Sequence, residues 1–322
     1  MIHFDDVAVA AALDRMPLIE ALNEAFQRDS IAPPRPHYSL GRSDASLLLM
    51  PAWDSSPNLG VKLVTVFPEN ASAALPAVHA CYVLFDAQNG SVRAILDGHE
   101  LTLRRTSAAS ALASRYLSRP DSTKLLMIGT GSLAPHLIES HCRVRPIDSV
   151  RIWGRTPAHA GRLAERLAQS LAAQPIRIEV AADLGEAAAW ADIISCATLA
   201  RDPLIQGQWL HAGQHVDLVG SYNPNMREAD ALTVKRAAVF VDVRSSAITD
   251  SGEIAQALRS GDIGPGHILA DLHDLTRQRH PGRRSASEIT LFKSVGHALE
   301  DLAAAQLVVS RYRPPPGAAR PQ

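Results

Sequence analysis

The stretch LLMIGTGSLA, residues 125–134, decides the fold, because it joins an apolar run to a helical run through a glycine-rich turn. The apolar residues predict a buried strand, and PHLIESH (135–141) has helical spacing. In this context GxGxxA predicts a dinucleotide site: Gly129 allows a tight turn, Gly131 a close approach of a pyrophosphate, and Ala134 close packing. The alternative is a glycine turn in an α/β fold that binds no nucleotide. The predicted cofactor contacts of the turn are Gly129, Thr130, Gly131, Ser132 and Leu133.

Strand and helix signals continue to alternate beyond this turn. The helical run PAHAGRLAERLAQSLAA (157–173) places Leu163, Leu167 and Leu171 on one face. Apolar runs predict five further strands: SVRIWG (149–154), IRIEV (176–180), DIISCA (192–197), HVDLVG (215–220) and AAVFVDV (237–243). Strands that alternate with helices at this spacing predict an α/β fold, a doubly wound parallel sheet of Rossmann type, over residues 119–299.

The flanking segments predict a second domain of a different kind. Residues 1–118 contain a helix at about 17–28, strands of a mixed sheet, a hairpin at Asn89-Gly90 and a helix at 106–117. The run at 294–312 predicts one amphipathic helix that returns to this domain, which we expect to be completed by about 300–312. Residues 313–322 lack apolar periodicity and are predicted to form a mobile tail.

Composition excludes several classes of function. The 322 residues carry 32 Lys+Arg and 33 Asp+Glu, a net charge of -1, which argues against broad nucleic-acid or membrane binding. The three cysteines are too few and too scattered for a disulfide framework or a zinc site, and no histidine motif suggests a metal. Early acidic residues and the lack of a basic n-region argue against a signal peptide, so we expect a cytoplasmic protein.

The choice of dinucleotide depends on the residues after the second strand of the sheet. Sites for NAD usually carry a carboxylate there, which binds the ribose hydroxyls. This chain has Gly154, Arg155 and Thr156 instead, and an arginine and a hydroxyl can bind a 2′-phosphate. The sequence therefore favours NADPH, with NADH possible. The alternative is that Arg155 is a solvated residue at the start of the next helix.

Three cations outside the nucleotide-binding segment stand in unusual settings. Arg35 lies in PPRPHY, Lys62 interrupts the apolar strand LGVKLVTVF, and Arg105 opens the helical run after LTLR. A lysine in such a strand is more often on the solvent face, so pattern alone leaves the role of Lys62 open.

Several segments together resemble the ornithine cyclodeaminase/mu-crystallin family, in order and with matching spacing. The resemblance implies a substrate-binding and dimerisation domain made from both chain ends, a Rossmann domain and a homodimer. It also implies that Arg35, Lys62 and Arg105 grip a substrate carboxylate, and that Arg105 and Thr106 lie near the cofactor phosphates. The segments are GVKLVTVFPEN (60–70), DGHELTLRRTSAASALASRYL (97–117), GTGSLA, GSYNPNMREAD (220–230) and TLFKSVGHALEDLAAA (290–305).

One departure from the family pattern bears on the reaction. Cyclodeaminases and related alanine dehydrogenases place a catalytic aspartate where this chain has Tyr222. A phenol, with an ordinary pKa of about 10, is a poor base at neutral pH. GSYNPNMREAD, SGE (251–253) and TLFKSVG are instead similar to the reductases of cyclic ketimines.

This branch implies NADPH-dependent reduction of Δ1-pyrroline-2-carboxylate to L-proline, of Δ1-piperideine-2-carboxylate to L-pipecolate, or of both. Lys62, Tyr222 or water is then the proton donor. The alternatives are amino-acid deamination of cyclodeaminase or alanine-dehydrogenase type, and a protein that holds NADPH without turnover. Further predicted contacts are Thr198, Gly220, Ser221 and Ser294 for the cofactor and Val295 for the substrate.

Overall fold

The computed structural model describes residues 1–41, 45–55, 57–73 and 75–313. The chain divides into two compact units, one of Met1–Thr106 with His297–Gln322 and one of Ser107–Gly296. The predicted mobile tail lies, from residue 314 onward, outside the described residues.

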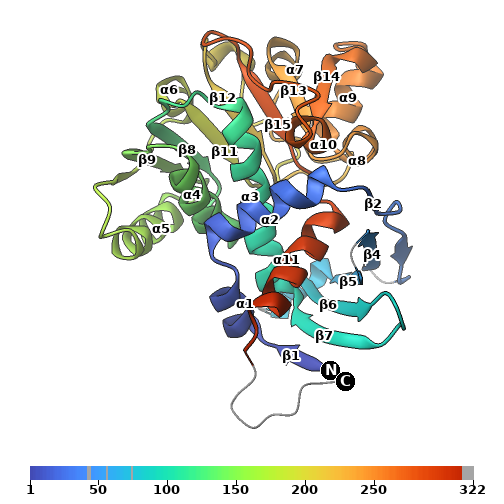
Figure 1. Ribbon diagram of the computed structural model, residues 1–322. Helices are drawn as coiled ribbons and strands as arrows, with labels where there is room; N and C mark the ends of the chain where they lie inside the picture. Colours follow the sequence, from blue (N-terminus) through green and yellow to red (C-terminus); the bar gives the residue numbers. More distant parts are fainter. Residues whose placement is uncertain (42–44, 56, 74, 314–322) are drawn as a thin grey trace. The chain divides into compact units, whose positions relative to one another are not determined.

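The unit Ser107–Gly296 is built on an eight-stranded, fully parallel sheet in the order β10-β9-β8-β11-β12-β15-β13-β14 (Figure 1). This confirms the predicted Rossmann-type α/β fold and its six strands. Two strands were not expected, β14 and β15, and β15 lies between β12 and β13. The strands are β8 (Lys124–Ile128), β9 (Ser149–Trp153), β10 (Arg177–Val180), β11 (Ile193–Cys196), β12 (His215–Leu218), β13 (Ala238–Val241), β14 (Ile268–Asp271) and β15 (Thr290–Lys293).

Helices cover both faces of this sheet because alternate side chains of each strand point to opposite sides. On β8, Leu125 and Met127 pack with α4 (Leu133–Val144) and α5 (Pro157–Ser170). Leu126 and Ile128 pack into a second core that contains residues of the remaining helices. Those helices are α6 (Leu184–Trp190), α7 (Ala231–Arg236), α8 (Arg244–Asp250) and α9 (Gly252–Ser260). A short helix, α10 (Leu272–Thr276), follows β14.

The other unit contains the predicted mixed sheet, in the order β1-β7-β6-β5-β4-β2 with β3 paired to β4 (Figure 1). Its pairs are antiparallel except β1 with β7, and Gly90 at the predicted hairpin has a φ of 75°. The helices α2 (Arg15–Gln27) and α11 (Ala298–Arg311) pack on each other, and α1 (Asp6–Ala12) lies beside α11. The strands are β1 (Ile2–Phe4), β2 (Ser30–Ile31), β3 (His37–Ser39), β4 (Ser46–Asp54), β5 (Asn58–Val66), β6 (Val78–Asp86) and β7 (Val92–Asp97).

Two helix boundaries differ from those predicted. The helix expected at 106–117 is α3 (Gly98–Leu117), which begins earlier because the side chain of Asp97 accepts a hydrogen bond from the Glu100 N–H. The helix expected at 294–312 begins only at Ala298, because Gly296 has a φ of 82° and the N–H groups of Val295 and Gly296 bind Asp242. None of the described helices is both long and apolar enough to cross a membrane.

Candidate active site

The glycine-rich turn combines a tightly packed glycine with an open one. Gly129 has a φ of 112°, and a Cβ there would lie 2.5 Å from the carbonyl oxygen of Ala197, so only glycine fits. At Gly131 no heavy atom lies within 4 Å of an added Cβ, so the backbone faces open space. Ala134 is buried, and its N–H donates to the Gly131 carbonyl. Ser132 and Leu133 begin α4, whose N-terminus favours an anion.

The end of β9 lies against this turn and leads into exposed polar residues. A Cβ on Gly154 would lie 2.8 Å from the γ-methyl group of Thr130, so the two segments are in close contact. Arg155 and Thr156 are exposed, and the Thr156 side chain makes no cap hydrogen bond although Thr156 is the N-cap residue of α5. A guanidinium and a hydroxyl are thus presented at this strand end, with no carboxylate in residues 154–156.

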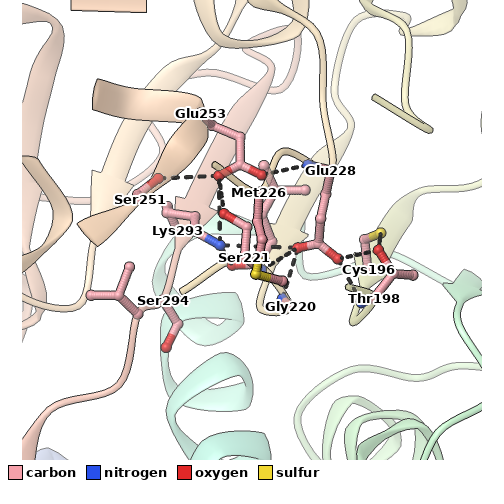
Figure 2. A network of polar contacts seen from close by, with 12 residues as sticks. Cys196, Thr198, Gly220, Ser221, Met226, Glu228, Ser251, Glu253, Lys293 and Ser294 are labelled. Atoms are coloured by element: carbon pink, nitrogen blue, oxygen red, sulfur yellow. Dashed lines mark hydrogen bonds and ion pairs between the residues drawn. The ribbon is translucent and has the colours of Figure 1, made fainter. Parts of the chain in front are cut away.

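The predicted residues at the ends of β11 and β12 are joined by a carboxylate that the sequence analysis did not identify. Glu228 Oε1 accepts hydrogen bonds from the Thr198 N–H (2.7 Å) and hydroxyl (3.0 Å). Its Oε2 accepts from the N–H groups of Gly220 (2.7 Å) and Ser221 (3.3 Å), as Figure 2 shows. A Cβ on Gly220 would lie 2.0 Å from the Thr198 carbonyl oxygen, so the two strand ends approach as closely as a glycine permits.

A second carboxylate and a lysine complete this buried network (Figure 2). Glu253 Oε1 accepts from the Glu228 N–H at 2.6 Å, and its Oε2 accepts from the hydroxyls of Ser221 (2.5 Å) and Ser251 (3.1 Å). Lys293 Nζ lies 3.9 Å from Glu228 Oε2 and 3.8 Å from Glu253 Oε2. Burial raises the pKa of Glu228, and the nearby Glu253 raises it further, although Lys293 lowers it.

The predicted contacts in the KSVG segment are positioned by Asp242, which directly follows β13. Its Oδ2 accepts hydrogen bonds from the N–H groups of Val295 and Gly296, each at 2.7 Å, and from the Ser294 hydroxyl at 3.2 Å. Ser294 and Val295 are buried. Burial raises the pKa of Asp242, while the backbone N–H groups that donate hydrogen bonds to it lower this pKa.

In the other unit, two of the three predicted cations are brought together by α11. Lys62 Nζ lies 2.8 Å from Asp301 Oδ1, and Arg105 Nε donates to the same oxygen at 2.9 Å. Arg105 also pairs with Glu300 at 2.6 Å. Lys62 is 2% exposed, so the solvent-face interpretation of this lysine is wrong. Burial and the charge of Arg105 lower the pKa of Lys62 to about 8, although Asp301 and Glu300 raise it.

A buried tyrosine beside this cluster was also missed by the sequence analysis. Tyr82 on β6 is paired in register with Lys62 on β5 and is completely buried. Its hydroxyl makes no hydrogen bond within the part of the chain that the structure describes. A Cβ on Gly60 would lie 1.9 Å from that hydroxyl, so the space for Tyr82 depends on glycine. Burial raises the pKa of Tyr82 well above its ordinary value, so the hydroxyl remains a donor.

The remaining predicted residues occupy different settings. Thr106 follows Arg105 on α3 and is buried, whereas Arg35 is half-buried in the segment between β2 and β3. Tyr222 is 42% exposed, directly after the Glu228-bound residues Gly220 and Ser221. The roles of these residues stay predictions.

A parallel sheet of this order, with GxGxxA after its first strand, defines the class of dinucleotide-binding α/β proteins. The sequence profile of the ornithine cyclodeaminase/mu-crystallin family matches residues 1–314. The chain belongs to this family, which confirms the resemblance.

Three similar proteins carry informative names. Delta(1)-pyrroline-2-carboxylate reductase of Colwellia psychrerythraea is 37% identical over 299 residues, 91% of this chain and 94% of that one. The Thermococcus litoralis reductase of the same name, solved with NADH and L-proline, is 32% identical with a TM-score of 0.92, over 96% of this chain and 97% of that one. An archaeal alanine dehydrogenase dimer with bound NAD is 27% identical with a TM-score of 0.88, over 96% and 95%.

Proposed function

We propose that this chain is an oxidoreductase that reduces the C=N bond of a cyclic ketimine carboxylate. The products are L-proline from Δ1-pyrroline-2-carboxylate and L-pipecolate from Δ1-piperideine-2-carboxylate. The observation that carries the proposal is the buried Lys62–Arg105 pair in a chain that also has an open glycine turn for a dinucleotide. Relatives named for this reaction, one of them solved with NADH and L-proline, support it.

The cations of the first unit bind and orient the substrate. The guanidinium of Arg105 and the ammonium of Lys62 attract the substrate carboxylate, and such charge-assisted bonds fix its orientation. Arg35 is assigned to the same carboxylate by the family resemblance. The Tyr82 hydroxyl, buried with no hydrogen bond in the described residues, is available as a further donor to substrate.

The cofactor is assigned to residues of the second unit. Residues 129–133 hold the pyrophosphate, and Arg155 and Thr156 hold a 2′-phosphate, so we propose NADPH with NADH as the competing cofactor. When bound, the reduced nicotinamide supplies the hydride that the imine carbon accepts. NADH remains the competing cofactor because the Thermococcus relative was solved with bound NADH.

A proton must reach the imine nitrogen as the carbon accepts the hydride. With its pKa lowered to about 8, Lys62 remains largely protonated at neutral pH and gives up its proton more readily than an ordinary lysine. Lys62 is therefore the donor that we favour over Tyr222 and water. The balanced reaction consumes one proton and converts the cyclic imine into a secondary amine.

We further assign substrate binding and dimerisation to Met1–Thr106 with His297–Gln322, and dinucleotide binding to Ser107–Gly296. Exposed apolar residues on strands of the first unit, Ile31, Tyr38 and Val78, are suitable for a contact with a second copy. The archaeal relative described as a dimer supports a homodimer. Three cysteines without disulfides are compatible with the reducing cytoplasm, where we place the protein.

The test is an assay with each imine and either NADPH or NADH, in parallel with ornithine plus NAD⁺. We expect rapid loss of the reduced-nicotinamide absorbance with at least one imine, faster with NADPH, and no reaction of ornithine. Ammonia release from ornithine, with both imines inert, would contradict the proposal and favour deamination.

A further inference from the structure

Charged side chains are gathered, out of contact with solvent, where three neighbouring strands of the parallel sheet end. Glu228 binds the residues that follow β11 and β12, and Lys293 is the last residue of β15 (Figure 2). Glu228 and Lys293 are 0% exposed, and Glu253 is 1% exposed. Buried ions are costly unless they are paired, so such a group at a ligand-binding edge calls for a functional explanation.

Both carboxyl groups accept several hydrogen bonds, and at Glu228 the Thr198 N–H opposes burial and the neighbouring Glu253, which raise its pKa. Three backbone N–H groups, which can only donate, point to Glu228 from Thr198, Gly220 and Ser221. Glu253 accepts the N–H of Glu228 itself and two hydroxyl groups. Donors of this kind stabilise a carboxylate against its acid form.

The cluster of Glu228, Glu253 and Lys293 has two carboxyl groups and one ammonium group, so it holds one negative charge in excess when both carboxyl groups are ionised. Two carboxylates face one ammonium group, which also donates to the Leu218 carbonyl at 3.3 Å. Asp242, buried near the end of neighbouring β13, adds another carboxylate rather than a compensating cation.

We propose that this excess negative charge stabilises the oxidised nicotinamide relative to the reduced one, which makes the bound cofactor a stronger hydride donor. This inference rests on the proposed function, because it requires a bound dinucleotide. The nicotinamide ring changes from neutral to positively charged when it loses hydride. In doubly wound sheets, ligands bind outside the carboxyl ends of the strands. The cluster of Glu228, Glu253 and Lys293 is buried at this same edge of the sheet. In a water-poor site the field of an unpaired charge extends beyond direct contact.

The test compares the dissociation constants of NADP⁺ and NADPH, measured by calorimetry, for the parental chain and Glu228→Gln. This substitution keeps the size of the side chain and removes the charge. We expect the ratio Kd(NADP⁺)/Kd(NADPH) to rise by about fivefold or more, because the oxidised form loses more binding energy than the reduced form.

Asp192→Asn is the matched control. Asp192 precedes β11 at its amino end and, like Glu228, accepts two backbone N–H bonds through one oxygen, here from Thr123 and Lys124. Six residues of extended chain place it roughly 20 Å from Thr198. We expect its Kd ratio to equal that of the parental chain.

Two further variants separate charge from folding. Glu253→Gln removes the second negative charge and should also raise the ratio Kd(NADP⁺)/Kd(NADPH). This variant tests the inference if Glu228→Gln does not fold. Glu228→Asp keeps the charge and should retain the parental ratio even if its melting temperature falls. Unchanged ratios in both glutamine variants, or an equal rise in Asp192→Asn, would overturn the inference. A parental chain that binds neither the NADP⁺/NADPH pair nor the NAD⁺/NADH pair would instead overturn the proposed function, and this inference with it.

Discussion

The two buried charge clusters of this chain are built differently. In the first unit, the carboxylates of Glu300 and Asp301 hold the side chains of Lys62 and Arg105, so two anions balance two cations. In the second unit, Glu228 holds backbone N–H groups of three residues, and a single lysine serves both Glu228 and Glu253.

The partners of each cluster determine what that cluster can do. Cations held by side chains of a neighbouring helix remain chemical groups that an added carboxylate can attract, as the proposed substrate requires. Carboxylates bound to backbone N–H groups fix the shape of the strand ends, and because these donors are neutral they do not cancel the negative charge. We therefore assign substrate binding and proton transfer to the first cluster. The second cluster is assigned to shaping the strand ends at which the cofactor binds and to the electric field at the nicotinamide.

The largest expected effect comes from Lys62→Met. Loss of the ammonium group removes both a carboxylate contact and the proposed proton donor, so kcat/KM for the imine should fall by about 10³-fold. The Kd of NADPH should change by less than about threefold, because the turn that we assign to the pyrophosphate belongs to the second unit. Steady-state kinetics and fluorescence titration measure the two quantities.

Two variants serve as comparisons for Lys62→Met. Lys235→Met, an exposed lysine in α7, should leave both quantities unchanged. Tyr222→Phe should keep most of the imine turnover. Near-normal turnover in Lys62→Met, or a loss confined to Tyr222→Phe, would transfer the proton-donor role to another group.

Asp301→Asn should move the pH profile. Asp301 raises the pKa of Lys62, whereas burial and Arg105 lower it to about 8. Removal of this carboxylate therefore lowers the Lys62 pKa further, so the loss of activity on the alkaline side should begin about one pH unit lower. The other ionisable groups near Lys62, namely Arg105, Glu300 and Tyr82, remain in the variant.

The pH profile of kcat/KM between pH 6 and about pH 9 measures this shift. Glu100→Gln, which removes a carboxylate paired with Arg104 on α3, is the control and should keep the parental profile. An unchanged alkaline limb in Asp301→Asn would show that Lys62 does not set it.

Two glycine substitutions separate ligand space from packing. In Gly220→Ala the new Cβ would collide with the Thr198 backbone, so we expect a loss of about 3 kcal/mol or more in the free energy of unfolding. In Gly131→Ala the Cβ enters open space, so stability should change by less than about 0.5 kcal/mol. NADPH binding should nevertheless weaken by about tenfold, because the pyrophosphate must approach this backbone.

Urea unfolding and calorimetric titration of both variants make this comparison. A Gly131→Ala chain that binds NADPH as tightly as the parental chain would contradict the assignment of the turn to the pyrophosphate.

The smallest expected effect concerns cofactor choice. Arg155→Ala removes a cation from the end of β9 and should raise the KM for NADPH by about tenfold, with little change for NADH. Arg162→Ala, exposed further along α5, is the matched control. Equal changes for NADPH and NADH in Arg155→Ala would remove Arg155 from the 2′-phosphate site.

Sequence predicted the nucleotide-binding fold because its signals are local. Apolar runs, helical spacing and GxGxxA lie within single segments, and the six expected strands are present. Strand β15 was missed because its short apolar run is bounded by Thr290 and the buried Lys293, so it lacks the continuous apolar pattern of the other strands. Its place between β12 and β13 depends on long-range pairing that no local pattern expresses.

The charge clusters were predictable only in part, since their partners are distant in sequence. Lys62 and Asp301 are 239 residues apart, and the apolar strand around Lys62 was compatible with a solvent-facing lysine. Glu228 lies in GSYNPNMREAD and Glu253 in SGE, yet nothing in those segments shows that either carboxylate accepts hydrogen bonds from backbone N–H groups.

Hydride transfer to the imine carbon is tested most directly by following a deuteride from cofactor to product. The parental chain is mixed with Δ1-pyrroline-2-carboxylate and NADPH carrying deuterium on both C4 positions, and the product is analysed by mass spectrometry and NMR. We expect L-proline with one deuterium at Cα from the parental chain, and almost no L-proline from Lys62→Met. Proline without deuterium, or no proline from a parental chain that binds NADPH, would contradict it.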